Sequence, residues 1–304
     1  MSDSPSVATG AYFDAWHGGV VDTMIGMPAS SAERNTKHYA QMNAGILDKE
    51  AREKFTFPAQ YMFKDVPDYG EVDDPVALLL AEMDRFNIRR GMINVATNEV
   101  ARIAAANHPD RFIASFNADP NRGMDCVREL EVAVKDLGVR SAQVFPAGLL
   151  PQVPINDKKM YPLYAKCVEL EIPIFVNAGV PGPRVPMACQ DVAHIDEVCW
   201  FFPDLKFVMR HGAEPWTRLA AKLMLKWPNL YYSTSAFAPK HYPADIVHFA
   251  NTRGADKVIY AGYFPMGLSL ERIFAELPSV PFRDHVWPKF LRENAERILG
   301  LEHA

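Results

Sequence analysis

Polar residues stand at the ends of several short apolar runs, where they could take part in chemistry. In chain order they are Asp22, Asn94, Asn117, Asp119, Gln143, Asn177, His211, Ser233, Ser235 and Tyr263. Most carry neutral amides or hydroxyls. Imidazole is the side-chain type among them that titrates near neutral pH. This pattern singles out His211 as the candidate general acid or base.

A carboxylate commonly orients a catalytic imidazole, and two acidic residues are candidates for that role. Asp22 lies within the first apolar run, and Glu214 follows His211 by three positions. We therefore predict His211, Asp22 and Glu214 as the catalytic set. Arg210 is expected to point away from His211, because adjacent residues of a strand face opposite sides.

Four further residues are predicted to contact a substrate. Asn177 and Tyr263 could donate hydrogen bonds to an oxyanion or a carbonyl, with a purely structural role as the alternative. His17 is a candidate, although a histidine beside a tryptophan is more often structural. Tyr61 lies in an aromatic segment that would cover the pocket and favour an apolar or aromatic acyl substrate. The other aromatic residues of that segment are Phe55, Phe57 and Phe63.

Strand-like and helix-like patterns alternate along the chain and would position these residues. Eight such units favour a parallel sheet with crossover helices and fit a (β/α)8 barrel, whose active site lies at the carboxyl ends of the strands. An open doubly wound sheet is the disfavoured alternative, because neither GxGxxG after the first strand nor GxxxxGK[ST] occurs. The expected strands are 19–25, 91–95, 112–117, 139–145, 172–177, 205–209, 230–235 and 257–261.

The expected helices complete the prediction of an α/β fold of the TIM-barrel type. We predict a single domain over residues 1–304, with an insertion or lid at about residues 28–72. Asp74 and the proline after it predict a helix start, by N-cap and first-turn preference. The expected helices are 33–54, 75–86, 99–107, 124–137, 160–170, 192–202, 217–227, 244–252, 268–276 and 286–299.

Composition excludes several classes of protein. The 304 residues are 49% hydrophobic and 23% charged, with a net charge of −5, which argues against disorder and against broad binding to nucleic acid or membranes. No apolar run reaches the roughly 18 residues of a membrane span, and the first residues lack a signal-peptide pattern, so we expect a cytoplasmic protein. Four cysteines without CxxC spacing are expected to be buried thiols.

Three segments resemble the amidohydrolase-2 (amidohydrolase-related) family, which includes aminocarboxymuconate semialdehyde decarboxylase and related aromatic-acid decarboxylases and hydrolases. Residues 202–216, FPDLKFVMRHGAEPW, are similar to the family's FPDLK…HGGGPW. Residues 256–266, DKVIYAGYFPM, are similar to DKVLFGSDYPM, and residues 290–299 resemble the NAxRLL-type last helix. Residues 22–26, DTMIG, stand where the family has DxHxH. The segments occur in the family's order.

The resemblance implies a divalent-metal site that this chain has lost. The family takes two histidines from the first strand, one from the fifth and an aspartate from the eighth, and uses the sixth-strand histidine as acid/base or ligand. Met24, Gly26, Asn177 and Tyr263 occupy the four ligand positions, and His211 alone remains. A thioether, an amide, a phenol and one imidazole make a poor site for a divalent ion. We therefore expect no metal and no other cofactor.

Another alignment leaves an alternative open. Asp14-Ala15-Trp16-His17 could occupy the first motif, but it supplies one histidine rather than two at alternate positions. A rebuilt metal site from His17, Asp22 and His211 is the remaining alternative.

Taken together, the residues and the resemblance predict a metal-independent hydrolase or C–C lyase with His211 as general acid/base. Its partner would be a small acyl or carboxylate metabolite, and the resemblance implies a homodimer. The alternative is a catalytically inactive pseudoenzyme that serves as a ligand-binding or partner-stabilising subunit. A roomy pocket around His211 would favour catalysis, and a plugged one would favour the pseudoenzyme.

Overall fold

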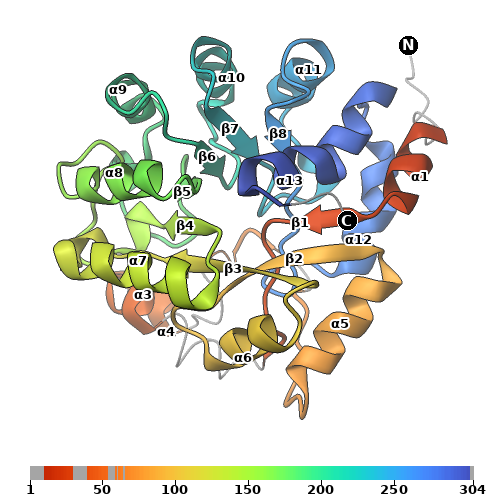
Figure 1. The fold of residues 1–304 in the computed structure, drawn as a ribbon, viewed down its shortest axis with the longest axis horizontal. Helices are drawn as coiled ribbons and strands as arrows, with labels where there is room; N and C mark the ends of the chain where they lie inside the picture. The colour runs from red at the N-terminus through yellow and green to blue at the C-terminus, as the bar shows by residue number, and fades with distance from the viewer. Residues whose placement is uncertain (1–9, 30–39, 54–58, 60, 64–65, 302–304) are drawn as a thin grey trace.

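Eight parallel strands form the centre of the molecule in a computed structural model that describes residues 10–29, 40–53, 59, 61–63 and 66–301. Their order in the sheet is their order in the chain, and helices surround them (Figure 1). This confirms the TIM-barrel prediction. The strands are β1 (Val20–Asp22), β2 (Ile88–Asn94), β3 (Phe112–Asn117), β4 (Ser141–Val144), β5 (Ile174–Asn177), β6 (Phe207–Arg210), β7 (Leu230–Ser233) and β8 (Val258–Ile259).

The surrounding helices follow the predicted alternation closely. Asp74 caps α5 as expected, because its Oδ1 accepts the N–H groups of Val76 and Ala77 at 3.1 and 2.9 Å. The described α-helices are α1 (Gly10–His17), α3 (Ala40–Ala44), α4 (Lys49–Glu53), α5 (Pro75–Arg85), α6 (Glu99–Asn107), α7 (Met124–Leu137), α8 (Tyr161–Glu169), α9 (His194–Phe201), α10 (Thr217–Lys226), α11 (Ala244–Thr252), α12 (Leu270–Glu276) and α13 (Asn294–Leu299).

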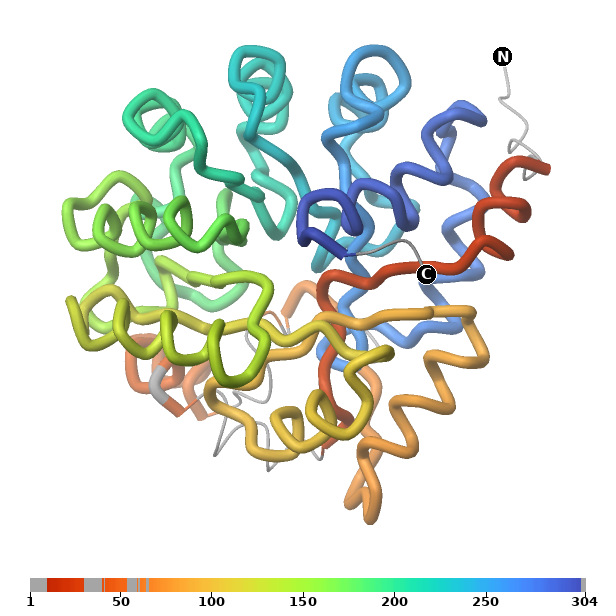
Figure 2. Tube along the Cα trace, viewed as in Figure 1, coloured from red at the N-terminus to blue at the C-terminus, as the bar shows by residue number. Residues whose placement is uncertain are grey.

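The two ends of the sheet meet between β1 and β8. Beyond the strands, the N–H of Gly26 donates to the carbonyl of Phe264 at 2.9 Å, and the N–H of Thr23 donates to that of Tyr260 at 3.4 Å. Figure 2 shows the N-terminal segment beside the C-terminal one, where the Arg292 guanidinium also donates to the carbonyl of Gly18. These contacts join the first and last strands.

Apolar side chains fill the interior of the barrel at the end where the strands begin. One side chain from each of seven strands forms an inner layer, and α13 closes it from below. Because side chains alternate along a strand, the residue two positions further on faces the same interior, nearer the carboxyl end. The layer consists of Val21, Met92, Ile113, Phe175, Val208, Tyr231 and Ile259, with Ala295, Ile298 and Leu299 from α13.

The early segment departs from its prediction. One helix was expected over 33–54, but α3 ends at Ala44 and α4 begins at Lys49. Asp48 starts the second helix by accepting the Ala51 N–H at 2.6 Å, which favours a new helix over a continuous one. Residues 33–39 and 54 of this predicted helix lie outside the described part of the chain, as do Phe55 and Phe57.

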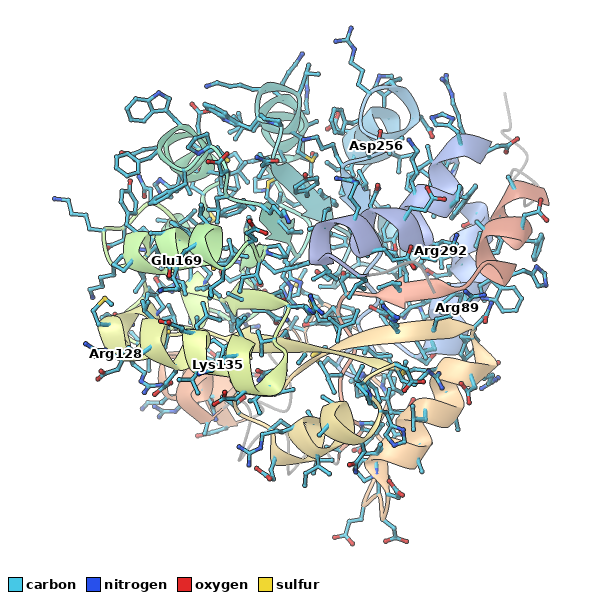
Figure 3. The ribbon with its side chains drawn as sticks, in the orientation of Figure 1. Arg89, Arg128, Lys135, Glu169, Asp256 and Arg292 are labelled. Atoms are coloured by element: carbon cyan, nitrogen blue, oxygen red, sulfur yellow. The ribbon has the colours of Figure 1, made fainter. Side chains whose placement is uncertain are left out.

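Charged side chains cover the outer helices, as Arg128, Lys135 and Glu169 show in Figure 3. Among the described residues, no helix is long and apolar enough to cross a membrane. The four cysteines are free and buried, as predicted. The single-domain organisation, the homodimer and the cytoplasmic location stay predictions.

Candidate active site

The turn after β6 has an unusual backbone that places His211. His211, Gly212 and Ala213 have φ values of 62°, 88° and 54°. Each non-glycine residue in this left-handed region costs roughly 1–2 kcal/mol, and such strain gathers at functional sites. The Tyr232 hydroxyl holds the turn by donating to the Gly212 carbonyl at 3.0 Å. A side chain at Gly212 would collide with the Phe237 ring, so this position needs glycine.

His211 is oriented by Ser235 rather than by a carboxylate. Its Nδ1 lies 2.9 Å from the Ser235 Oγ, which also accepts the His211 backbone N–H at 3.2 Å. The other face of the site is aromatic. The Tyr263 ring meets the imidazole edge-on at 5.6 Å, and Phe63 stacks on Tyr263 at 5.6 Å. The residues following β6, β7 and β8 thus meet beneath the segment that carries Phe63.

Arg210 points into the barrel, and the opposite expectation was wrong. It follows Val208 of the inner layer by two positions and therefore shares its face. The side chain is 94% buried, since 6% of the residue is exposed, and its Nη1 donates to the Gln143 Oε1 at 2.7 Å. Among the described residues, its Nε has no hydrogen-bond partner. Asn177 pairs with Arg210 in the β5–β6 register and is also buried.

The guanidinium and the burial of the site set the charge of the imidazole. Burial, reinforced by the positive charge of Arg210, lowers the pKa of His211 to about 3. Burial also lowers the pKa of Arg210 to about 10, so this side chain stays charged at neutral pH. The site therefore holds a neutral imidazole beside a buried cation.

Asp22 is buried, but it does not face His211. Because Val21 belongs to the inner layer, the next side chain turns toward the surrounding helices. The Asp22 Oδ1 accepts the N–H groups of Met24 and Gly262, each at 2.9 Å, and its Oδ2 has no partner within the described segments. Burial raises its pKa to about 7. Asp22 therefore does not contact the imidazole that it was predicted to orient, and we propose a structural role for it.

Three other predicted residues also lie away from the imidazole. Glu214 is exposed after the turn. Ser235, and not Glu214, makes the contact with the imidazole that was predicted for a carboxylate. His17 ends α1 before β1 begins, at the opposite end of the barrel, and its Nδ1 lies 2.6 Å from the carbonyl of Phe13. Tyr61 is 54% exposed on the rim, with the Arg184 guanidinium 5.5 Å from its ring centroid. Of the predicted substrate contacts, Tyr263 lies beside His211 and Asn177 lies beside Arg210.

Sequence reasoning missed the roles of Arg210, Gln143 and Ser235. Gln143 and Ser235 were recognised as polar residues at strand ends, but no contact was predicted for either of them. The predicted sixth strand ended at Met209, whereas β6 runs to Arg210. Counting in steps of two from an interior valine would have placed the arginine correctly.

The donors present do not fit the divalent ion that the family resemblance implies. Among the described residues, no three His, Cys, Asp or Glu side chains come together as a potential metal site. Nδ1 of the one imidazole at the strand ends already faces Ser235. The adjacent Arg210 guanidinium would repel a second cation in this low-dielectric interior. We therefore derive no chemistry through a metal.

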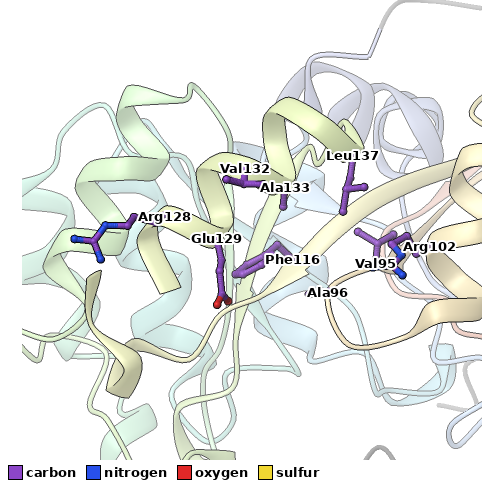
Figure 4. A pocket seen from close by; sticks show the side chains of 9 residues that line it. All are labelled: Val95, Ala96, Arg102, Phe116, Arg128, Glu129, Val132, Ala133 and Leu137. Atoms are coloured by element: carbon purple, nitrogen blue, oxygen red, sulfur yellow. The ribbon is translucent and has the colours of Figure 1, made fainter. Parts of the chain in front are cut away.

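A shallow groove lies elsewhere, between α6 and α7 (Figure 4). It encloses about 330 Å³ and contains none of the predicted site residues. Its charged residues are satisfied within the chain, since Arg102 pairs with Glu99 and Glu129 pairs with Arg122. The groove therefore offers no unpaired group to a ligand. Its lining is Val95, Ala96, Arg102, Phe116, Arg128, Glu129, Val132, Ala133 and Leu137.

Comparisons with known proteins agree with this architecture. A family model described as Amidohydrolase matches residues 38–301. An uncharacterized TIM-barrel protein from Bordetella bronchiseptica is 24% identical, with a TM-score of 0.71 over 93% of this chain and 99% of that one. No curated protein matches.

Two decarboxylase structures share the fold at lower identity. A 2,6-dihydroxybenzoate decarboxylase in complex with 2,6-dihydroxybenzoate is 14% identical, with a TM-score of 0.64 over 93% of this chain and 99% of that one. A 5-carboxyvanillate decarboxylase from Novosphingobium aromaticivorans with bound manganese is 16% identical, with a TM-score of 0.64 over 93% and 97% of the two chains.

Proposed function

This chain belongs to the amidohydrolase family, and we propose that it is a metal-independent hydrolase or C–C lyase acting on a small acyl or carboxylate metabolite. The observation that carries the proposal is the meeting of a neutral imidazole and a buried guanidinium at the carboxyl end of β6. In TIM-barrel enzymes, catalytic residues occupy these strand ends. Decarboxylases among the structural neighbours support a carboxylate substrate.

In this proposal His211 moves the proton. Ser235 engages Nδ1 and fixes the ring, which leaves Nε2 to exchange a proton with the ligand. A neutral imidazole with a very low pKa is a weak base, so the free site is not yet tuned for proton transfer. A bound carboxylate would offset the charge of Arg210 and raise the imidazole pKa toward the working pH.

Aromatic side chains shape the rest of the proposed pocket. Tyr263 lies against the imidazole and Phe63 covers Tyr263, so the ligand would meet apolar ring surface beside the charged group. Asn177, buried opposite Arg210 in the register, would hold a ligand carbonyl or oxyanion. This combination suits a compact, planar acyl or carboxylate compound.

A turnover assay tests the proposal. Purified protein treated with a chelator would be incubated with 2,6-dihydroxybenzoate, 5-carboxyvanillate, simple carboxylic esters and amides, and product formation would be followed by chromatography and carbon dioxide release. We expect conversion of at least one class by the chelated protein, and a loss of about 100-fold or more in His211→Asn, the range of general acid–base catalysis. The Arg102→Gln variant, changed in the separate groove, is the matched control and should keep full activity.

Two outcomes would contradict the proposal. Turnover that disappears with the chelator and returns with manganese would overturn metal independence. Binding of these compounds without any conversion would favour the pseudoenzyme, in which the barrel keeps a ligand-binding role alone.

A further inference from the structure

We propose that Arg210 is the anchor for a carboxylate group of the ligand and supplies, from within the chain, the positive charge of the site. The inference rests on the proposed function, because it concerns the ligand of the same site. It assigns a binding role to a residue that the sequence predicted to face away.

The geometry of the side chain carries the argument. Arg210 is 94% buried, since only 6% of its surface is exposed, and it faces the interior at the carboxyl end of β6. A guanidinium has five N–H donors in a fixed fork. One nitrogen donates to the Gln143 side chain, and the Nε donor has no partner in the described part of the chain. At least one N–H donor of the guanidinium therefore lacks an acceptor among the described residues.

The charge of Arg210 is also unbalanced. Among the described residues, no Asp or Glu side chain forms an ion pair with it, and its polar partner is the neutral amide of Gln143. Buried charges in proteins are nearly always paired, because transfer of an isolated ion out of water is costly. The described arginines that do form ion pairs, such as Arg102 and Arg122, have more exposed side chains than Arg210. The exception at Arg210 points to an anionic ligand.

A carboxylate fits this environment better than a second cation or a neutral group. Two carboxylate oxygens match the arginine fork in a bidentate pair, and the pairing is stronger in a water-poor site. The nearby Tyr263 and Phe63 rings would flank the body of the ligand. The same charge explains why the donor set does not suit a divalent ion. We infer that arginine performs here the anion-holding task for which the resemblance implies a metal.

Benzoate and its neutral isostere benzamide form a probe pair for this inference. Binding to the full chain would be measured by calorimetry at constant ionic strength, with and without chelator. We expect benzoate to bind at least about 30-fold more tightly than benzamide, about 2 kcal/mol of charge-assisted hydrogen bonding. Chelator should leave the benzoate affinity unchanged, and added manganese should not raise it.

Two variants examine Arg210 itself. Arg210→Gln should lose the preference for benzoate. Gln143→Glu would place a carboxylate against the guanidinium, form an internal ion pair and weaken benzoate binding about 10-fold or more while keeping the cation. This second variant keeps the test decisive if Arg210→Gln does not fold. Arg102→Gln is the matched control and should bind benzoate like the natural chain.

The inference is overturned if benzoate and benzamide bind equally, if folded Arg210→Gln or Gln143→Glu binds benzoate normally, or if chelator abolishes binding. These measurements need no turnover. A chain that binds benzoate through Arg210 but converts no substrate would therefore contradict the proposed enzyme activity and leave the anchor standing.

Discussion

The Nδ1 atom of His211 and the Oγ atom of Ser235 lie 2.9 Å apart, and the same hydroxyl accepts the His211 backbone N–H at 3.2 Å. One buried serine after β7 therefore fixes both the ring and the backbone of the residue that follows β6. A carboxylate in that position would add a negative charge, whereas a hydroxyl orients the imidazole and leaves it neutral beside Arg210.

Removal of this hydroxyl should destabilise the fold. Ser235→Ala leaves a backbone N–H and a ring nitrogen without their partner, so we expect a loss of about 1–3 kcal/mol in the free energy of unfolding. Ser233→Ala is a matched control, because the buried Ser233 hydroxyl has no partner in the part of the chain that the structure describes. Its removal should lower the free energy of unfolding by less than about 1 kcal/mol. Urea denaturation of both variants checks this. Equal losses would show that Ser235 does not hold His211.

The imidazole of His211 should remain neutral throughout the ordinary pH range. Its pKa falls from 6.5 to about 3, because the site is buried and Arg210 faces it. Between these values the unfolded chain binds the extra proton and the folded chain does not, so this residue makes stability rise with pH from about 3 to about 6.5. Nitrogen-15 NMR of the ring checks this directly. A ring that titrates near pH 6.5 would contradict the burial argument.

The left-handed backbone at His211 predicts an unequal effect of two truncations. Alanine and glycine both remove the imidazole, but only glycine relieves the strain of φ = 62°. His211→Gly should therefore be more stable than His211→Ala by roughly 1 kcal/mol, with equally low activity. Thermal denaturation of the two variants measures the difference. Glycine that is less stable than alanine would show that the turn is not strained there.

Substitution of Asp22 should change the free energy of unfolding and leave the turnover rate unaffected. Its pKa rises from 3.8 to about 7, so the folded chain holds a proton that the unfolded chain has lost, and the contribution of Asp22 to stability falls as pH rises from about 4 to 7. Asp22→Asn keeps the Oδ1 that accepts from Met24 and Gly262 and removes this dependence. We expect it to be at least as stable as the natural chain at pH 8.

Asp22→Ala gives the contrasting result. It leaves two backbone N–H groups without an acceptor and should be less stable than Asp22→Asn by about 2 kcal/mol or more at both pH values. Urea denaturation at pH 5 and pH 8 compares the three chains. A catalytic Asp22 would instead show as lost turnover in a stable Asp22→Asn protein.

The sequence by itself determined the kind of fold and the strand ends at which the candidate site is proposed. Alternating apolar and amphipathic stretches are local signals, and they located eight strands, including β3 with its bounds unchanged from 112–117. Family motifs in the right order identified the strand that carries His211. These inferences succeed because hydrophobic periodicity and short motifs depend on neighbours in the chain.

Only the tertiary structure decided which side chains meet. Strand side chains alternate, so Arg210 shares the interior face of Val208. The left-handed turn begins at His211 and breaks this alternation, which is why counting from His211 predicted the wrong direction for Arg210. The same alternation turns Asp22 toward the helices, although it ends a strand as a catalytic residue would. Ser235 reaches His211 from just beyond the neighbouring strand β7, 24 positions away in the chain. Strand register, closure of the barrel and a left-handed turn set these contacts, and none of them is a local property of the sequence.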